Sequence, residues 1–304
     1  MEDNLIKIAE ASKISGIPDS TLYDWIKEGR IRVIDDGKNK LLDKIEVLKA
    51  TATVITFYNL KGGVLKTSLS RTLGFYFATQ AKDEVLFIDL DPQGNLTKSL
   101  TAQRDFLTIH NFLENNTSLD KIVINVMPKM DLIPANLNLA KDNDFHIDYV
   151  NEKMLNEFKK LFKKYKIVII DCPPNFTGLT RLGAVIANYI FIPVQPDVFS
   201  YEGIGLALEL MNNIVKFNSN FIDYRAVLTM VRNNMVSIEK HFKAKLEDDL
   251  KKKLLHNYIP DFYAMKEVNA TLEDIYQDKY KGDKLDKVRD VCKEIENIIY
   301  YERG

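Results

Sequence analysis

Six short apolar runs after residue 51 constrain the fold of this chain more than any other feature of its sequence. Helical patterns separate most of these runs, an order typical of strands joined through helices. Two runs, "VLFID" and "IVIID", are almost continuously apolar, which indicates strands buried on both faces of a sheet. We therefore predict an α/β fold, a mainly parallel sheet flanked by helices. The runs are "TVITFYN", "EVLFIDLD", "MDLIPAN", "KIVIIDCPP", "YIFIPVQPD" and "YRAVLTMVR".

The composition narrows the class of protein. A chain of 304 residues with 46% hydrophobic and 28% charged residues is long enough for one large globular domain and a small one. Its two cysteines, Cys172 and Cys292, offer neither a disulfide framework nor metal-site spacing, so a reducing cytosol is the expected compartment. The formal net charge of −1 creates no global basic field, so any DNA contact has to come from a local patch. No apolar run approaches the roughly 20 residues that span a bilayer, and no membrane partner is expected.

The first fifty residues follow a different pattern, and we predict a small domain over 1–50 and a larger one over 51–304. Apolar residues from Leu5 to Ile14 recur at roughly helical spacing. Asp19 or Ser20 can cap a second helix, "STLYDWIKEG", after which "RIRVID" and "LLDKIEVLKA" suggest a hairpin wing and a closing helix. This order is the winged helix-turn-helix plan, in which the second helix enters the major groove of DNA.

This segment resembles the N-terminal winged helix of MerR-type regulators, which implies DNA binding. It carries nine Lys and Arg against ten Asp and Glu, however. A small helical appendage used only for dimerisation or packing therefore stays open as the alternative. The candidate DNA contacts are Ser20, Thr21, Tyr23, Lys27, Arg30 and Arg32.

The stretch "NLKGGVLKTS", residues 59–68, stands between a predicted strand and a predicted helix. A glycine-rich turn there directs backbone N–H groups and the positive end of the helix dipole at an anion. The general phosphate-loop pattern G-x-x-x-x-G-K-[ST] fails at both glycines, which are Leu60 and Leu65 here. Lys66 would reach the β- and γ-phosphates of a nucleotide, and Thr67 would coordinate Mg²⁺. The alternative is an ordinary turn with exposed lysines.

Three carboxylates follow the ends of predicted strands. Asp89 and Asp91 end "VLFIDLD", and Asp171 ends "IVIID". Because ligands of parallel sheets bind at the carboxyl ends of the strands, we expect these groups close to the phosphate loop. Asp171 would hold a metal-bound water beside Mg²⁺. Together with the loop, the three carboxylates predict a nucleotide–metal site and disfavour the ordinary turn.

Five motifs occur in the order and spacing of the ParA/Soj partition ATPases, which belong to the MinD-like group with a deviant Walker A motif. The motifs are "KGGVLKT", "IDLDPQGN", "DLIPAN", "IVIIDCPP" and "IPVQPDVFSYEGI". The resemblance implies binding of ATP and Mg²⁺, hydrolysis of ATP to ADP and phosphate, and an ATP-dependent homodimer. It also implies DNA binding, a ParB-like centromere-binding partner, and a cytoplasmic, nucleoid-associated protein.

The resemblance also assigns roles to residues. Lys61 matches the lysine that crosses the dimer interface to the phosphates of the partner's ATP. Asp91 matches the aspartate that positions the attacking water, Asp89 is its metal-side neighbour, and Asp171 is the Walker B acid. The implied catalytic residues are Lys61, Lys66 and Asp91, and the implied metal ligands are Thr67, Asp89 and Asp171. The implied ATP-binding residues are Lys61, Gly62, Gly63, Val64, Leu65, Lys66, Thr67 and Ser68.

Leu65 departs from the family, which usually has glycine there. Glycine is preferred where the backbone approaches a ligand closely or needs a positive φ. Either the loop tolerates leucine and binds ATP more weakly, or the chain does not turn ATP over normally. In the second case it would be a DNA-binding repressor that uses the ATPase fold as a dimerisation scaffold. A MinD-like membrane regulator is a third class, disfavoured because its anchor helix would need a more basic polar face.

Further basic residues gather in "EKHFKAKLEDDLKKKLLHNY", and Arg232 follows a predicted strand. A basic surface of this kind can bind DNA phosphates without sequence preference. Glu247, Asp248 and Asp249 interrupt the run, so a solvated helix face is the alternative. The candidate DNA contacts in this part of the chain are Arg232, Lys243 and Lys245.

Overall fold

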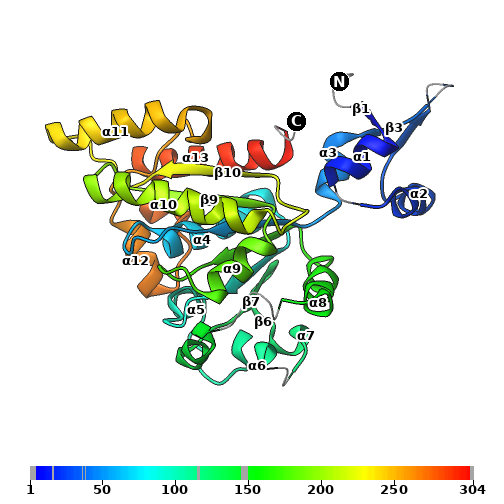
Figure 1. Ribbon diagram of the computed structural model, residues 1–304, viewed down its shortest axis with the longest axis horizontal. Coiled ribbons are helices and arrows are strands. Elements are labelled where there is room, and N and C mark those ends of the chain that lie inside the picture. Colours follow the sequence, from blue (N-terminus) through cyan, green and yellow to red (C-terminus); the bar gives the residue numbers. More distant parts are fainter. Residues whose placement is uncertain are drawn as a thin grey trace. The chain divides into compact units, whose positions relative to one another are not determined.

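The computed structural model describes residues 5–15, 17–35, 37, 39–114, 117–144 and 150–301. The chain divides into two compact units, one made of 1–52 with 295–304 and the other of 53–294 (Figure 1). The division into domains over 1–50 and 51–304 remains a prediction.

The larger unit is built on a seven-stranded sheet with the order β10-β9-β4-β8-β5-β7-β6. Neighbouring strands are parallel, except that β6 pairs with β7 in the antiparallel direction. This confirms the mainly parallel sheet, and each of the six predicted runs contains a strand. The strands are β4 (Thr53–Phe57), β5 (Val85–Asp89), β6 (Ile124–Met127), β7 (Met130–Ile133), β8 (Ile167–Asp171), β9 (Tyr189–Val194) and β10 (Asp223–Leu228).

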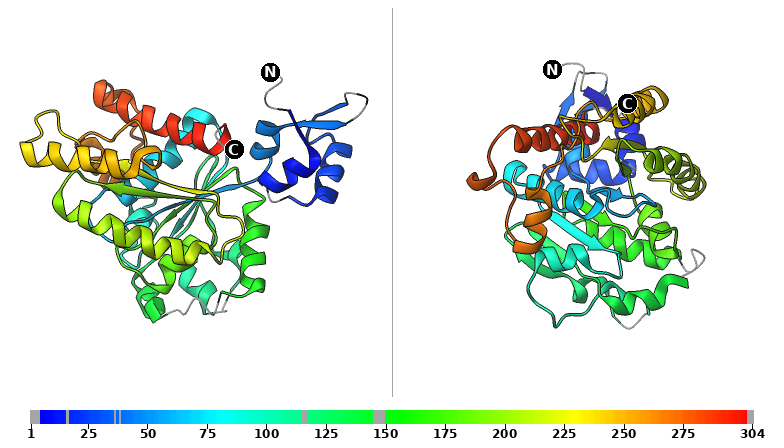
Figure 2. Two further views of the ribbon diagram at one scale, coloured as in Figure 1. Left: turned by 45° about the horizontal axis from the view of Figure 1, so that its top comes forward. Right: turned by 90° about the vertical axis from the view of Figure 1, so that its left-hand side faces the viewer.

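Helices cover both faces of this sheet. Figure 2 shows α4 and the first part of α13 on one side and α9 and α10 on the other. The helical elements are α4 (Lys66–Phe75), η2 (Tyr76–Ala81), α5 (Asn95–Leu100), α6 (Ile109–Leu113), α7 (Leu119–Ile122), η3 (Leu137–Asp144), α8 (Glu152–Phe162), α9 (Gly178–Val185), α10 (Val198–Val215), α11 (Ser237–Leu250), η5 (Lys251–Lys253), α12 (Ala264–Thr271), η6 (Asp278–Tyr280) and α13 (Asp283–Tyr300).

The two-sided burial predicted for the central strands is confirmed. Every residue of β4, β5 and β8 is buried. Gly74 lets α4 lie directly on β5, because a Cβ there would stand 2.0 Å from Cζ of Phe87. The sheet therefore fixes where α4 begins, and with it the phosphate loop. No helix within the described ranges is long and apolar enough to cross a bilayer.

The first unit contains a helix, a turn, a second helix, a hairpin and a closing helix, in the predicted order. Its three strands form an antiparallel sheet with the order β1-β3-β2. The expected helical start at Leu5 is wrong, since Leu5–Lys7 is a strand that pairs with β3 and buries Ile6. The elements are β1 (Leu5–Lys7), α1 (Ile8–Ser15), α2 (Asp19–Lys27), β2 (Val33–Asp35), β3 (Lys40–Asp43) and α3 (Lys44–Lys49).

Candidate functional site

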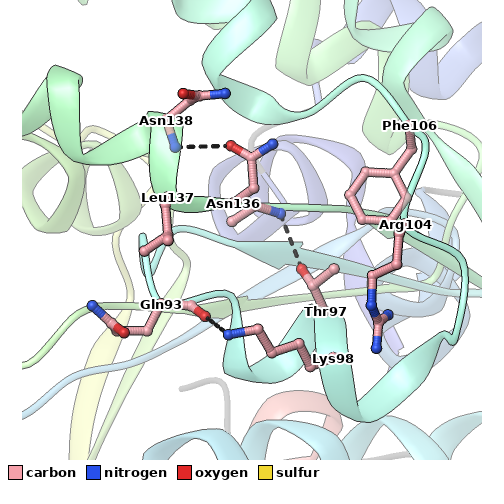
Figure 3. Close-up of a pocket in the computed structure, with 9 residues that line it drawn as sticks. Gln93, Thr97, Lys98, Arg104, Phe106, Asn136, Leu137 and Asn138 are labelled. Atoms are coloured by element: carbon pink, nitrogen blue, oxygen red, sulfur yellow. Dashed lines mark hydrogen bonds between the residues drawn. The ribbon is translucent and has the colours of Figure 1, made fainter.

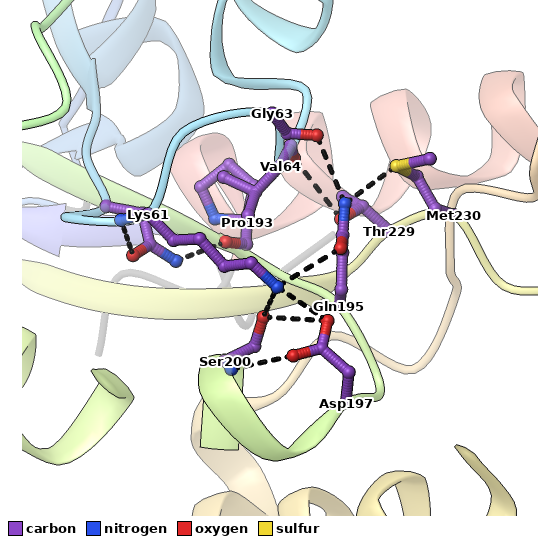
Figure 4. Close-up of polar contacts among 10 residues, drawn as sticks. Lys61, Gly63, Val64, Pro193, Gln195, Asp197, Ser200, Thr229 and Met230 are labelled. Carbon is purple, nitrogen blue, oxygen red and sulfur yellow. Dashed lines mark hydrogen bonds and ion pairs between the residues drawn. The ribbon is translucent and has the colours of Figure 1, made fainter. Parts of the chain in front are cut away.

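The loop between β4 and α4 is anchored through its carbonyl groups. Gln195 Nε2 donates to Gly63 O at 3.1 Å, and Thr229 Oγ1 donates to Val64 O at 3.2 Å (Figure 4). These donors come from the ends of β9 and β10. In contrast, the backbone N–H groups from Gly62 to Thr67 find no acceptor among the described residues. A row of unpaired N–H groups at a helix start is the arrangement that binds anions.

The loop also leaves room in front of its glycines. A Cβ built on Gly62 or on Gly63 would meet no heavy atom within 4 Å. Gly63 has a φ of 76°, a conformation that side chains disfavour. Successive N–H groups in such a turn form a concave cradle for phosphate oxygens. This geometry fits the predicted nucleotide and disfavours an ordinary turn.

Leu65 stands at the N-cap of α4 in the left-handed conformation, with φ of 71° and ψ of 25°. A positive φ is one of the two conditions under which glycine is preferred at such a position. The conformation costs a non-glycine residue roughly 1–2 kcal/mol. Burial of the side chain, which is 9% exposed, offsets part of this cost. Leucine also brings no side-chain oxygen to cap the first turn, so the N–H groups there stay available.

Lys66 folds back over the loop. Its Nζ donates to the carbonyl oxygens of Asn59 and Lys61, both at 3.0 Å. Burial lowers the pKa of Lys66, while the charges of Asp171 and Asp91 partly oppose this shift. Lys66 is thus close enough to two of the three predicted carboxylates, Asp171 and Asp91, to be affected by their charge.

Thr67 and Asp171, two of the three predicted metal ligands, form a hydrogen bond with each other, and their metal role remains a prediction. Thr67 Oγ1 donates to Asp171 Oδ2 at 2.6 Å, and Ser70 Oγ donates to Oδ1 at 3.2 Å. Burial raises the pKa of Asp171, and the nearby Asp89 raises it further. In the described part of the chain, no group of three or more His, Cys, Asp or Glu residues can hold a metal. The hydroxyl of Thr67 and the carboxylate of Asp171 are oxygen ligands of the kind that Mg²⁺ takes, usually one or two protein groups together with waters and substrate phosphates.

Both carboxylate oxygens of Asp89 accept hydrogen bonds from the protein. Its Oδ2 accepts from the N–H and the hydroxyl of Thr97, both at 2.8 Å, and its Oδ1 accepts from Asp91 N at 3.0 Å. Burial raises the pKa of Asp89 to about 6 despite these hydrogen bonds. The metal-side role of Asp89 remains a prediction. Its hydrogen bond from Asp91 N is observed, and it supports the turn after β5, residues 90–94, which we call the Asp91 turn. The sequence reasoning missed Thr97, which only its place in "PQGNLT" could have signalled.

Asp91 lies in the Asp91 turn and is 8% exposed. Gln93 N donates to its Oδ1 at 2.9 Å, and Gly94 N donates to its carbonyl at 2.8 Å. The bond from Gln93 holds the carboxylate within the turn, and its charge opposes the lowering of the Lys66 pKa by burial. Its position is compatible with orienting a water at a phosphate.

Lys61 is held within its own chain. Its Nζ donates to Asp197 Oδ2 at 2.7 Å, to Ser200 Oγ at 3.0 Å and to Gln195 Oε1 at 3.4 Å (Figure 4). Partial burial raises the pKa of Asp197, but the hydrogen bonds from Lys61 and Ser200 outweigh it and lower the pKa overall. All three partners lie in the motif "IPVQPDVFSYEGI", but none of them was predicted as a site residue.

The candidate DNA contacts of the first unit lie on α2 and just after it. Thr21 is half-buried, and Arg30 lies over the ring of Trp25 at 4.3 Å. The exposed candidates are Ser20, Tyr23, Lys27, Arg30 and Arg32. Their arrangement does not by itself distinguish DNA binding from packing.

The candidate contacts of the larger unit have local partners. Arg232 pairs with Glu239 and Asp261, at 3.7 and 3.2 Å. Lys243 pairs with Glu247. Lys245 lies over the ring of Tyr201 at 5.1 Å. These partners reduce the positive charge available to DNA, and DNA binding by these residues remains a prediction.

Comparison with known families identifies the fold. A family model described as an AAA domain matches residues 52–223, which is more than half of the chain. The chain belongs to this AAA domain family. Within it, the chain is 33% identical over 171 residues to the chromosome-partitioning ATPase Soj of Treponema pallidum, covering 53% of this chain and 64% of Soj. It is 31% identical over 200 residues to the cell division protein PomZ of Myxococcus xanthus, covering 61% and 62%.

The chain thus spans less than two thirds of the length of these two relatives. Solved structures share the fold. McdA of Cyanothece in complex with ATP has a TM-score of 0.72 at 17% identity, covering 81% of this chain and 97% of McdA. Cobyrinic acid a,c-diamide synthase of Mycobacterium smegmatis with bound ADP and magnesium has a TM-score of 0.69 at 22% identity, covering 83% and 96%. At these identities, the two solved structures show a shared fold alone.

Proposed function

We propose that this protein is a ParA-type ATPase that drives DNA partition, of a plasmid or a chromosome, through ATP-dependent dimerisation. One observation carries the proposal: the N–H groups from Gly62 to Thr67 find no acceptor among the described residues, and the space in front of Gly62 and Gly63 is open. Lys66 Nζ folds back over the same loop. Soj of Treponema pallidum, to which the chain is 33% identical over 171 residues, is a chromosome-partitioning ATPase. The structures of McdA with ATP and of the synthase with ADP and magnesium support the same ligands.

In this proposal the residues at the carboxyl edge of the sheet have separate roles in binding and hydrolysing ATP. The N–H groups and Lys66 bind the phosphates, and Thr67 with Asp171 holds Mg²⁺. The metal, when bound, neutralises charge on the phosphates. Asp91 orients the attacking water, and Lys61 reaches the nucleotide of the second subunit. Because catalysis of phosphoryl transfer is mostly positioning and charge neutralisation, turnover by the protein alone should be slow.

The proposed partners follow from this assignment. The ATP-bound homodimer binds DNA without sequence preference, and a ParB-like protein stimulates hydrolysis and releases it. Residues 1–50 read a specific operator, which would also make the protein an autorepressor. The proposed location is the cytoplasm, on the nucleoid.

One observation favours a second function. Leucine in the left-handed conformation at position 65 is strained where the family usually has glycine. If this strain prevents turnover, the protein is a DNA-binding repressor that keeps the fold as a dimerisation scaffold.

ATP binding and turnover separate the two functions. We expect the unchanged protein to bind ATP with Mg²⁺ and to hydrolyse it slowly in the presence of DNA, and Leu65→Gly to do both better. Lys66→Ala is the control that should lose binding. If neither the unchanged protein nor Leu65→Gly hydrolyses ATP, the partition ATPase is refuted. If only Leu65→Gly does, the repressor is favoured, and its DNA binding should be sequence-specific and independent of ATP.

A further inference from the structure

A pocket of about 360 Å³ lies beside the Asp91 turn (Figure 3). Its walls come from Gln93, from α5 and the segment that follows it, and from the segment after β7. Because β4, β5 and β7 are parallel members of one sheet, the pocket shares the carboxyl edge with the phosphate loop. None of residues 61–68 lines it, so it is a separate space. Its volume lies within the range of roughly 300–1,000 Å³ that small ligands occupy.

The pocket is positively charged. Lys98 Nζ donates to the carbonyl of Gln93 at 2.6 Å, and Arg104 Nη1 donates to the carbonyls of Thr101 and Gln103 at 2.9 and 3.0 Å. Neither cation forms an ion pair with a carboxylate in the described part of the chain. The described lining residues include no acidic side chain. Two cations that meet only backbone carbonyls provide a site for an oxyanion such as phosphate.

The remaining walls suit a planar, polar group. Phe106 lines the pocket with a half-buried aromatic ring. Gln93, Asn136 and Asn138 add side-chain amides, and Asn136 Oδ1 already accepts from Asn138 N at 3.0 Å (Figure 3). An aromatic ring stacks on a nucleobase of any sequence, and amide groups donate to and accept from its edges. The combination of ring, amides and cations matches the parts of a nucleotide.

We propose that this pocket binds a nucleoside monophosphate, with its phosphate between Lys98 and Arg104 and its base against Phe106. It would be a second nucleotide site, distinct from the phosphate loop. Its ligand class follows from the walls alone and does not depend on the proposed ATPase activity.

The pocket is also connected to the Asp91 turn. Thr97 lines it, donates to Asp89, and accepts from Ala135 N at 3.0 Å. Lys98 holds the carbonyl of Gln93, whose N–H binds Asp91. A phosphate that draws Lys98 away from this carbonyl would loosen the turn that fixes Asp91. Occupancy should therefore change ATP turnover, a consequence that rests on the proposed function.

Calorimetric titration of the four common ribonucleoside monophosphates tests the site. The full chain carrying Lys66→Ala is used, so that the phosphate loop contributes little. We expect at least one monophosphate to bind, and Lys98→Ala or Arg104→Ala to weaken it about tenfold or more. Lys121→Ala removes an exposed lysine outside the pocket and should leave affinity unchanged. The matching nucleoside and inorganic phosphate should each bind more weakly than the monophosphate.

Three results would overturn the proposal. In the first, none of the four monophosphates binds. In the second, neither Lys98→Ala nor Arg104→Ala changes the affinity for the monophosphate. In the third, inorganic phosphate binds as tightly as the monophosphate. The last result would reveal a simple anion site. Thermal melts of each variant show whether the fold is retained. A protein that binds monophosphate but hydrolyses no ATP would refute the partition ATPase and leave the second site standing.

Discussion

Lys61 Nζ lies 2.7 Å from Asp197 Oδ2 of the same chain. Asp197 also caps α10, because its Oδ1 accepts from Ser200 N at 2.9 Å. One carboxylate therefore ties the phosphate loop to the start of a helix. Both side chains are about 30% exposed, so the contact is accessible to solvent. If Lys61 serves the nucleotide of a second subunit, it first has to leave Asp197.

Asp197→Asn should release Lys61 and strengthen ATP-dependent self-association. Asparagine caps a helix about as well as aspartate, so α10 should be unaffected. A partly exposed ion pair contributes about 0.2–1 kcal/mol, which corresponds to a gain of up to about fivefold per subunit. The association constant of a dimer that uses both Lys61 side chains should therefore rise by up to about 30-fold. Sedimentation velocity with a non-hydrolysable ATP analogue and Mg²⁺ measures it.

The gain should require Lys61. In a Lys61→Ala background, Asp197→Asn should change nothing further. A gain that persists without Lys61, or no gain in the single variant, would show that the contact does not restrain dimer formation. An ion pair at this exposure should also weaken with added salt, so the difference between Asp197→Asn and the unchanged protein should shrink at high ionic strength.

The left-handed backbone at Leu65 predicts a reversed order of two substitutions. Leu65→Gly and Leu65→Ala both remove the buried side chain, but only glycine adopts a φ of 71° without cost. We expect Leu65→Gly to be the more stable variant by roughly 1 kcal/mol. Leu69, buried in the regular part of α4, is the matched control, where alanine should exceed glycine by a similar amount. Urea unfolding measures both differences, and the same order at both positions would contradict the backbone argument.

The elements that could be predicted were those with a distinct local pattern of apolar residues. The β4, β5 and β8 runs were recognisable because burial on both faces makes a strand uniformly apolar. Strand β6 was missed because its four residues are half-buried or exposed at the sheet edge. Leu5–Lys7 was misassigned because three apolar or basic residues fit either period, and only pairing with β3 decides between them.

The candidate site divides in the same way. Thr67 and Asp171 could be brought together from sequence, because Asp171 ends β8 and Thr67 begins the helix that the phosphate loop joins to β4. Both therefore lie at the carboxyl edge of the parallel sheet. The partners of Lys61 could not, since Asp197 and Ser200 lie 136 and 139 residues further along the chain. Thr97 was equally hidden, because its contact with Asp89 depends on how α5 turns back after the strand.

Asp91→Ala should separate binding from turnover. The carboxylate accepts one backbone hydrogen bond, from Gln93, so its removal should perturb the fold little. A residue that orients water contributes only in the transition state, and its loss should lower kcat by about a hundredfold or more. The affinity for ATP should stay within about threefold of the unchanged protein. Nucleotide titration and single-turnover hydrolysis measure the two quantities, and equal loss of both would assign Asp91 to binding.

Two glycines in helices should respond to alanine in opposite directions. Gly74→Ala places a Cβ about 2.0 Å from the fully buried ring of Phe87, so the variant should lose roughly 1–3 kcal/mol or more of the free energy of unfolding. Gly205 lies in α10 with open space around it, and Gly205→Ala should gain about 0.5–1 kcal/mol. Phe87→Leu should recover part of the loss in the Gly74→Ala background, because leucine vacates the contact. Urea unfolding of the three variants tests this, and a neutral Gly74→Ala would mean that α4 does not lie directly against β5.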